Sequence, residues 1–250
     1  MAEHKHCLNC GAALHGAYCS HCGQAASTHR FNFHVVFGHD FMHAMFHFGG
    51  GFFYTLRQLF THPGRSVREY VAGKRVKHLN YFSFLIVVVL VFGAVESITD
   101  FNYQQVDLNG AADVRRLTEI ANDMMKNHPK LLFISILPLL ALTTWIMFRK
   151  ASQNFPEHLV LNTYKQAAVL VLNVFFVLMA SRLSAAGVVT AERILSVVSS
   201  AYIIWFYHQY FAPFYDSKTL LLGRVLMAMA LQFALLIGII VIILVAFPLR

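Results

Sequence analysis

The stretch VLMAMALQFALLIGIIVIILVAFP, residues 225–248, contains Gln232 as its only strongly polar side chain. Because a helix needs about 20 apolar residues to cross the hydrocarbon core of a bilayer, this stretch predicts a membrane-spanning helix. The composition agrees, since 57% of the 250 residues are hydrophobic and 13% are charged. That charged share is about half of what an ordinary soluble domain carries. We therefore expect lipid to cover part of the protein.

Five stretches of this kind predict an all-α integral membrane protein whose transmembrane domain covers residues 80–250. The predicted spans are residues 81–98, 131–148, 162–182, 194–211 and 225–248, with an outer loop at 99–130 that holds a short amphipathic helix. The third span carries several polar side chains, and polar groups are costly in lipid. A re-entrant third segment is therefore the alternative interpretation. The polar residues in question are Asn162, Lys165, Gln166 and Asn173.

Lysine and arginine residues are unevenly distributed between the predicted loops. With the N-terminus in the cytoplasm, 13 lie on the inner side, Lys165 included, and 7 lie on the outer side. Since inner loops of membrane proteins are enriched in these residues, we expect a cytoplasmic N-terminus and a periplasmic C-terminus in an inner membrane. The net charge of +8 favours an anionic lipid bilayer as partner. Nucleic-acid binding is not favoured, because residues 1–29 contain a single fixed cation, Lys5.

All four cysteines lie near the N-terminus, as CLNCG and CSHCG. Cys7, Cys10, Cys19 and Cys22 form a C-x2-C-x8-C-x2-C array, which is typical of a metal-binding ribbon. Four thiolates favour Zn²⁺, with an iron centre as the competitor. Because a ribbon of about 20 residues has almost no hydrophobic core, we expect the zinc to be structural. Residues 1–29 are therefore predicted to be a zinc ribbon that could dock a cytoplasmic protein partner.

The segment HDFMHAMFHFGG, residues 39–50, places histidines four residues apart within the predicted interfacial region, residues 30–61. His39, His43 and His47 fall on one side of a helix and phenylalanines on the other, as in an amphipathic helix lying in the membrane interface. The alternative is a second metal site, in which His158 and His208 supply further ligands. That alternative predicts a membrane metalloenzyme acting on a lipid or another hydrophobic substrate.

Residues 62–79 form a basic juxtamembrane hinge, in which Pro63 and Gly64 predict a turn. Lys74 and Arg75 are candidates for binding lipid or phosphate. At the start of the third span, Glu157, Asn162 and Lys165 are candidates for binding a substrate, because polar groups at membrane depth usually mark a pathway or site.

The order of these motifs resembles an uncharacterised bacterial family of multi-pass membrane proteins. The resemblance is carried by CLNCG and YCSHCGQ in the ribbon, by GFFYTL and PG before the first span, and by EYVAGKR and EHLVLN. It implies a bacterial membrane protein of this topology and implies no activity. The function predicted from the sequence is a small transporter or a membrane adaptor, with the metalloenzyme as the alternative.

Overall fold

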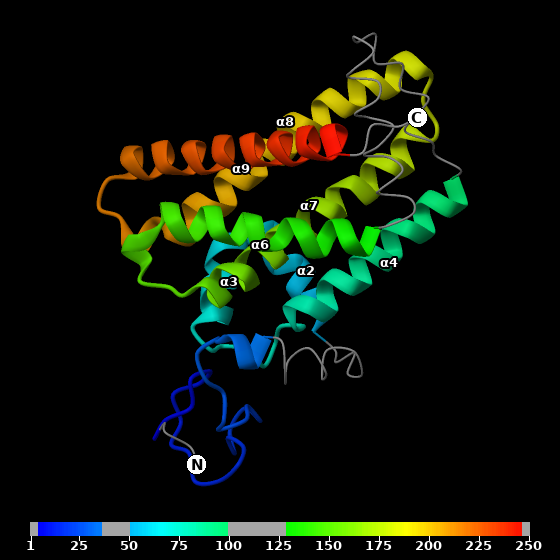
Figure 1. Ribbon diagram of the computed structural model, residues 1–250. Helices are drawn as coiled ribbons and strands as arrows, with labels where there is room; N and C mark the ends of the chain where they lie inside the picture. The colour runs from blue at the N-terminus through cyan, green and yellow to red at the C-terminus, as the bar shows by residue number, and fades with distance from the viewer. Residues whose placement is uncertain (1–4, 37–50, 100–128, 247–250) are drawn as a thin grey trace.

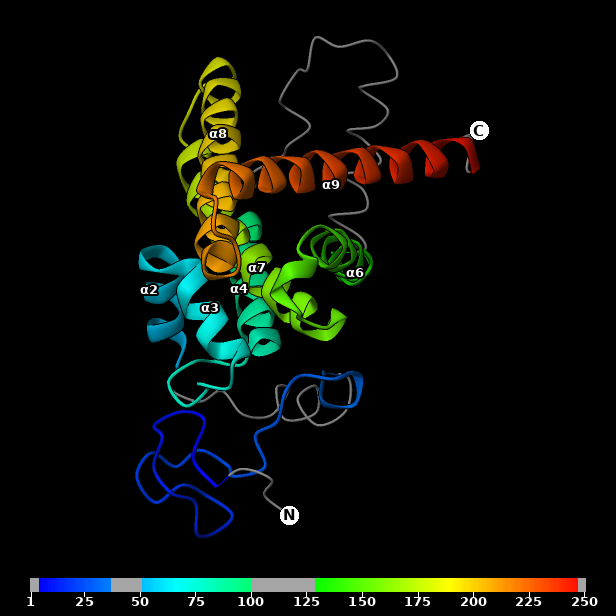
Figure 2. The same cartoon turned by 90° about the vertical axis from the view of Figure 1, so that its left-hand side faces the viewer.

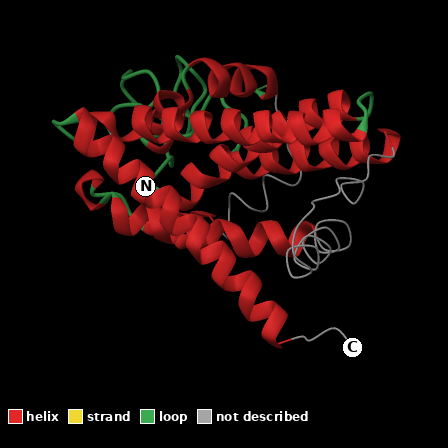
Figure 3. Ribbon diagram, turned by 90° about the horizontal axis from the view of Figure 1, so that it is seen from above, coloured by secondary structure: helices red, strands yellow, loops and turns green. Residues whose placement is uncertain are grey.

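The computed structural model describes residues 5–36, 51–99 and 129–246, and this part of the chain is helical with no extended strand (Figures 1 and 3). The predicted outer loop and the histidine segment at residues 39–50 lie outside the described residues. The described helices are α2 (Phe52–Thr61), α3 (Pro63–Val71), α4 (Tyr81–Thr99), α6 (Pro129–Met147), α7 (Phe155–Ala180), α8 (Ala185–Phe211) and α9 (Lys218–Ala246).

Four described helices are long and apolar enough to cross a membrane, namely α4, α7, α8 and α9. Helix α6 lies where the second span was predicted. The third segment is one uninterrupted helix of 26 residues rather than a re-entrant turn. Helices α8 and α9 begin earlier than expected, because polar residues outside the apolar windows start them. Ser184 accepts a hydrogen bond from the N–H of Gly187 at the start of α8, and Ser217 precedes α9.

Helix α7 is the centre of the helical assembly and packs against α4, α6 and α8, while α9 lies against α6 and α8 (Figures 1 and 2). Its alanines at 167 and 168 are fully buried, and small residues let helices in a membrane approach closely. Tyr164 is also fully buried and donates a hydrogen bond to the carbonyl of Leu79, at the entrance of α4. The most buried of the candidate spans therefore also holds the buried polar side chains Asn162 and Lys165.

The two short helices before the first span, α2 and α3, pack against the helical assembly. Helix α3 contacts α8 and α7, and α2 contacts α3 and α7. The predicted turn at Pro63 and Gly64 is wrong by one residue: α3 begins at Pro63, and the bend lies at His62. Gly64 is inside the helix because α3 crosses α8 at this point. A Cβ on Gly64 would lie 2.2 Å from the backbone nitrogen of Tyr210 and 2.4 Å from the carbonyl oxygen of Phe206. Only glycine permits this approach.

Replacing Gly64 with alanine is expected to push α3 away from α8. Overpacking of this kind costs about 1–3 kcal/mol, and thermal unfolding of the detergent-purified protein measures it as a lower midpoint. Gly93→Ala is the matched control, because a Cβ on Gly93 meets nothing within 4 Å. Equal midpoints for the two variants would contradict the close contact between α3 and α8.

Candidate functional site

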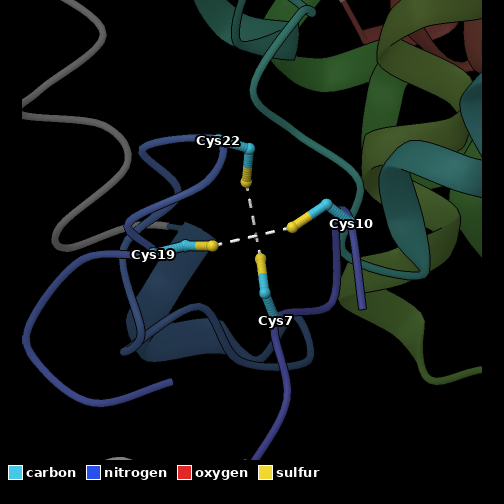
Figure 4. A group of neighbouring side chains, drawn as sticks. All are labelled: Cys7, Cys10, Cys19 and Cys22. Atoms are coloured by element: carbon cyan, nitrogen blue, oxygen red, sulfur yellow. Dashed lines mark hydrogen bonds between the residues drawn. The ribbon is translucent and has the colours of Figure 1, made fainter. Parts of the chain in front are cut away.

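The four ribbon cysteines point toward one centre (Figure 4). Each C-x2-C pair forms a tight turn in which a glycine N–H donates to the carbonyl of the first cysteine, Gly11 to Cys7 at 2.8 Å and Gly23 to Cys19 at 2.9 Å. Both glycines have positive φ, 78° and 76°, and glycine is the residue that adopts this conformation without a steric cost. The two turns are therefore built alike, and the CxxCG pattern explains both.

The distances between the sulfur atoms fit a single metal ion. All four Sγ atoms lie within 4.8 Å of one another, and the Cys7–Cys22 and Cys10–Cys19 pairs are each 3.6 Å apart. Four thiolates bound tetrahedrally at about 2.3 Å have their sulfurs about 3.8 Å apart. Hydrogen bonds from the backbone of Cys22 and His21 lower the pKa of the Cys19 thiol to about 6. This favours the thiolate form, which is the form that binds metal.

The ribbon is fixed to the membrane domain by Gln24, which directly follows its last CxxCG turn. The buried Gln24 side chain donates from Nε2 to the carbonyl of Gly73 at 2.9 Å and accepts at Oε1 from the N–H of Arg75 at 3.2 Å. Gly73 has a φ of 108°, and a Cβ there would lie 2.8 Å from Cδ1 of Leu8 in the first knuckle. The CGQ and AGKR motifs therefore meet at one contact, which we call the ribbon junction.

A second set of contacts ties the chain after the ribbon to the start of α7. Arg30 donates to both oxygens of Glu157, at 2.6 and 2.8 Å. The same carboxylate accepts the N–H of Asn154 at 2.8 Å and completes the N-terminal cap of α7. The Asn154 side chain donates to the carbonyl of Phe31 at 2.7 Å. Both oxygens of Glu157 therefore help to attach the chain after the ribbon to the start of α7.

The two basic hinge residues that were candidates for lipid binding have different surroundings. The guanidinium of Arg75 lies 3.7 Å above the ring centre of the buried Phe31 and donates to the carbonyl of His29 at 2.9 Å. It is therefore part of the ribbon junction. The Lys74 ammonium is exposed and lies 3.8 Å from the Glu69 carboxylate. Lys74 accordingly remains accessible to an anionic lipid surface.

Replacing Gln24 with alanine is expected to loosen the ribbon from the hinge. The variant leaves the Gly73 carbonyl and the Arg75 N–H without a partner, and unpaired buried groups cost about 1–3 kcal/mol each. Hydrogen exchange is the measurement: amides of residues 73–78 should exchange faster, while the cysteine turns keep their protection. His15→Ala, at an exposed ribbon position, is the control. Unchanged exchange in Gln24→Ala would show that the junction does not depend on this side chain.

His78 lies between the rings of Tyr54 and Tyr70, with ring centres 5.1 and 5.6 Å away, just before the first span. Burial lowers the pKa of His78 from 6.5 to about 4, partly opposed by the nearby carboxylate of Glu69. Folded His78 therefore stays neutral in a pH range in which an unfolded histidine is protonated.

Protonation of His78 is expected to destabilise the hinge at acidic pH. Its contribution to the free energy of unfolding is complete above pH 6.5 and is lost as the pH falls from 6.5 towards about 4. Thermal unfolding of wild type and His78→Gln at neutral pH and at about pH 5 measures this contribution as a difference, because other groups titrate equally in both. Identical pH dependence in the two proteins would rule out the assignment.

Inside the transmembrane domain, polar side chains from three helices meet around Asn162 of α7. Asn162 accepts from the hydroxyl of Tyr207 at 2.6 Å and donates to the hydroxyl of Thr144 at 2.9 Å. That hydroxyl also lies 3.0 Å from Nδ1 of His158. These four side chains are buried almost completely. Each makes a hydrogen bond that lipid could not provide.

Helix α9 adds a fourth element to this group. Gln232 donates from Nε2 to the hydroxyl of Thr143 at 2.9 Å and to the hydroxyl of Tyr207 at 3.3 Å. Gln232, the one strongly polar residue of the last predicted span, therefore links α9 to α6 and α8 by hydrogen bonds. We call the whole group the polar network; it consists of Thr143, Thr144, His158, Asn162, Tyr207 and Gln232.

Lys165 lies beside the polar network, about 15 Å along α7 from the N-terminal end of the helix at 1.5 Å per residue. Its exposed fraction is 2%. The ammonium lies 5.8 Å from the ring centre of Tyr207 and 3.5 Å from Oε1 of Gln166. No carboxylate among the described residues forms an ion pair with it. Lys165 therefore does not belong among the inner-loop cations, and the count on the inner side becomes 12 against 7.

The predicted second metal site is only partly within the described residues. Its stripe, His39, His43 and His47, lies outside them. His158 is buried in the polar network and stacks on Phe211 at a ring distance of 5.9 Å, and His208 is half-buried on α8. Within the described part of the chain, the cysteine group is the one cluster of three or more possible metal ligands. The second site stays a prediction.

Four members of the polar network, Thr143, Thr144, Tyr207 and Gln232, were not predicted as site residues. The two threonines also bond backbone carbonyls of their own helix, and Tyr207 fits a belt of interfacial aromatic residues in the sequence. Helical periodicity gives the face of α7 on which Asn162 lies. It does not give the helix that faces it, and no sequence pattern of this single chain would have supplied that partner.

Residues 50–93 match a family described as Protein of unknown function (DUF3667). The match covers α2, α3, the hinge with its ribbon junction residues Gly73 and Arg75, and the first part of α4. It agrees with a resemblance to an uncharacterised family. No curated protein and no solved structure matches the chain.

Proposed function

We propose that the protein is a small transporter of the bacterial inner membrane that binds a small anion at Lys165. The observation that carries this proposal is a lysine that is 2% exposed and lies within a membrane-spanning helix, without a carboxylate partner among the described residues. A charged ammonium in such a place is costly unless an anion accompanies it. A transported anion would supply that partner during part of each cycle.

The polar network supports transport because it provides neutral hydrogen-bonding groups next to the cation. Tyr207 contacts the Lys165 ammonium through its ring and donates from its hydroxyl to Asn162. Gln232 reaches the same hydroxyl from α9. Because these groups come from α7, α8 and α9, a rearrangement of those helices would change the surroundings of the bound anion, as alternating access requires.

The ribbon, in this proposal, is a brace on the cytoplasmic side that holds a structural zinc ion. Support comes from its attachment to the hinge through Gln24 and to α7 through Arg30 and Glu157. The helix that carries Lys165 is thus the helix that the ribbon holds in place. The positive-inside distribution of lysine and arginine supports a cytoplasmic ribbon and an anionic bilayer as its neighbour. A cytoplasmic protein partner would reach the exposed side of the ribbon.

Transport is tested in proteoliposomes on a solid-supported membrane, with gradients of chloride, acetate and inorganic phosphate as probes. Wild type should give a current with at least one anion, Lys165→Met should give none, and Lys165→Arg should keep part of it. Methionine has a similar volume and removes a buried charge, so the variant should fold. Lys77→Met, at an exposed hinge cation, is the matched control. Equal currents from Lys165→Met and wild type would refute the proposal.

The identity and number of the metals are tested separately by mass spectrometry of the purified protein. One zinc per chain is expected, both in wild type and in a His39/His43/His47 triple alanine variant. Cys10→Ser/Cys19→Ser should contain none and should lose the protection of its ribbon amides, because a ribbon of this size folds only with its metal. A second metal that disappears in the histidine variant would instead favour the metalloenzyme.

A further inference from the structure

A cavity of about 560 Å³ lies where the loop between α6 and α7 meets the turn between α8 and α9. Both connections lie on the side of the bundle to which the ribbon is attached, since Arg30 donates to the carbonyl of Ser152 and Gln153 donates to the hydroxyl of Tyr210 at the end of α8. The polar network and Lys165 are not part of its wall. The residues lining it are Lys150, Tyr215, Asp216, Ser217, Thr219, Leu220, Gly223, Arg224 and Met227.

Two cationic side chains lie near the ring of Tyr215 in this cavity. The ammonium of Lys150 lies 5.7 Å from the ring centre of Tyr215, and the guanidinium of Arg224 lies 5.5 Å from it. Arg224 donates to the carbonyl of Met147 at 3.2 Å, whereas neither cation forms an ion pair among the described residues. Asp216, which is exposed, also makes no ion pair with them. The wall therefore carries two cations and one carboxylate, which leaves a net positive charge and no ion pair among the three groups.

Hydroxyl groups surround the same space. Tyr215 is 8% exposed, and its buried hydroxyl approaches the backbone of Lys150 without making a hydrogen bond of ordinary geometry. The hydroxyls of Ser217 and Thr219 lie 3.0 Å apart in the turn that begins α9. The first N–H groups of a helix have no partner within the helix and favour an anion. An oxyanion in this space could accept a hydrogen bond from the Tyr215 hydroxyl and would lie beside two cations.

The remaining wall is apolar and belongs to the first turns of α9. Leu220 and Met227 are 69% and 55% exposed, and on a membrane-spanning helix this surface faces lipid. Gly223 lies between them and has open space where a Cβ would be. A ligand that fits both walls carries an anionic group at one end and has room for an apolar chain at the other.

We infer that this cavity binds a phosphate group, carried either by an anionic phospholipid or by a free phosphate. Charge-assisted hydrogen bonds from Lys150, Arg224 and Tyr215 would hold the phosphate oxygens. The apolar wall favours the lipid as the source, because an acyl chain could lie against Leu220 and Met227. This site is independent of the transport proposed for Lys165.

The test is binding of short-chain phosphatidic acid to the full-length protein in detergent, measured by native mass spectrometry. Lys150→Gln should weaken binding about tenfold, as the loss of one charge-assisted contact implies. Tyr215→Phe should weaken it several-fold, and Lys150→Arg should retain it. Lys218→Gln is the matched control, because Lys218 is exposed in the same turn but does not line the cavity. Asp216→Asn should strengthen binding.

Competition separates the two sources of the phosphate. Displacement of the lipid by millimolar inorganic phosphate would support a site for the phosphate group itself. Resistance to inorganic phosphate, with loss of binding in Lys150→Gln, would support an anionic lipid headgroup. Equal binding of short-chain phosphatidylcholine, or unchanged binding in both Lys150→Gln and Tyr215→Phe, would overturn the inference. Thermal midpoints near that of wild type establish that the variants are folded.

Discussion

Helix α7 crosses the membrane with His158, Asn162 and Lys165 buried in it, and lipid can satisfy none of these groups. The arrangement of the other helices follows from this constraint. Helix α6 supplies Thr144, α8 supplies Tyr207, and α9 reaches the same group through Gln232. The central position of α7 buries His158, Asn162 and Lys165 among neighbouring helices and so keeps these polar side chains away from lipid. Apolar packing alone would not have ordered the helices in this way.

The chain that follows the ribbon is attached to the first turn of the same helix. Glu157 caps α7 and pairs with Arg30, while Gln24 and Arg75 tie the ribbon to the hinge. Because these contacts use backbone groups of the hinge, the ribbon cannot move away without leaving buried donors and acceptors unpaired. Three of the motifs that carry the resemblance to an uncharacterised family therefore make structural contacts. CGQ meets AGKR at the ribbon junction, and EHLVLN supplies the Glu157 that pairs with Arg30.

The two anion-binding sites that we propose differ in their surroundings. Lys165 is enclosed by protein beside neutral hydrogen-bonding groups, so a ligand there must give up its hydration. The cavity of Lys150, Tyr215 and Arg224 lies at the ends of the helices beside an apolar wall. Because the two sites differ in solvation, a polar solute would bind at Lys165 and an amphiphile would bind in the cavity.

The sequence by itself determined which segments are helical and apolar enough to be candidate spans, and that four cysteines lie together where they could bind one metal ion. Both properties depend on neighbours within about 20 residues, for which apolar run length and CxxCG spacing are sufficient. It misplaced the bend at Pro63, because Pro63 occupies the first position of α3 and Gly64 lies inside the helix against the backbone of Tyr210. It also could not assign roles to Glu157, Arg75 or Lys165. Whether each is paired, stacked or left without a counter-ion depends on residues far away in the chain, such as Arg30 and Tyr207. Only the tertiary structure decides this, because a helical period fixes a side chain's direction and not what it meets.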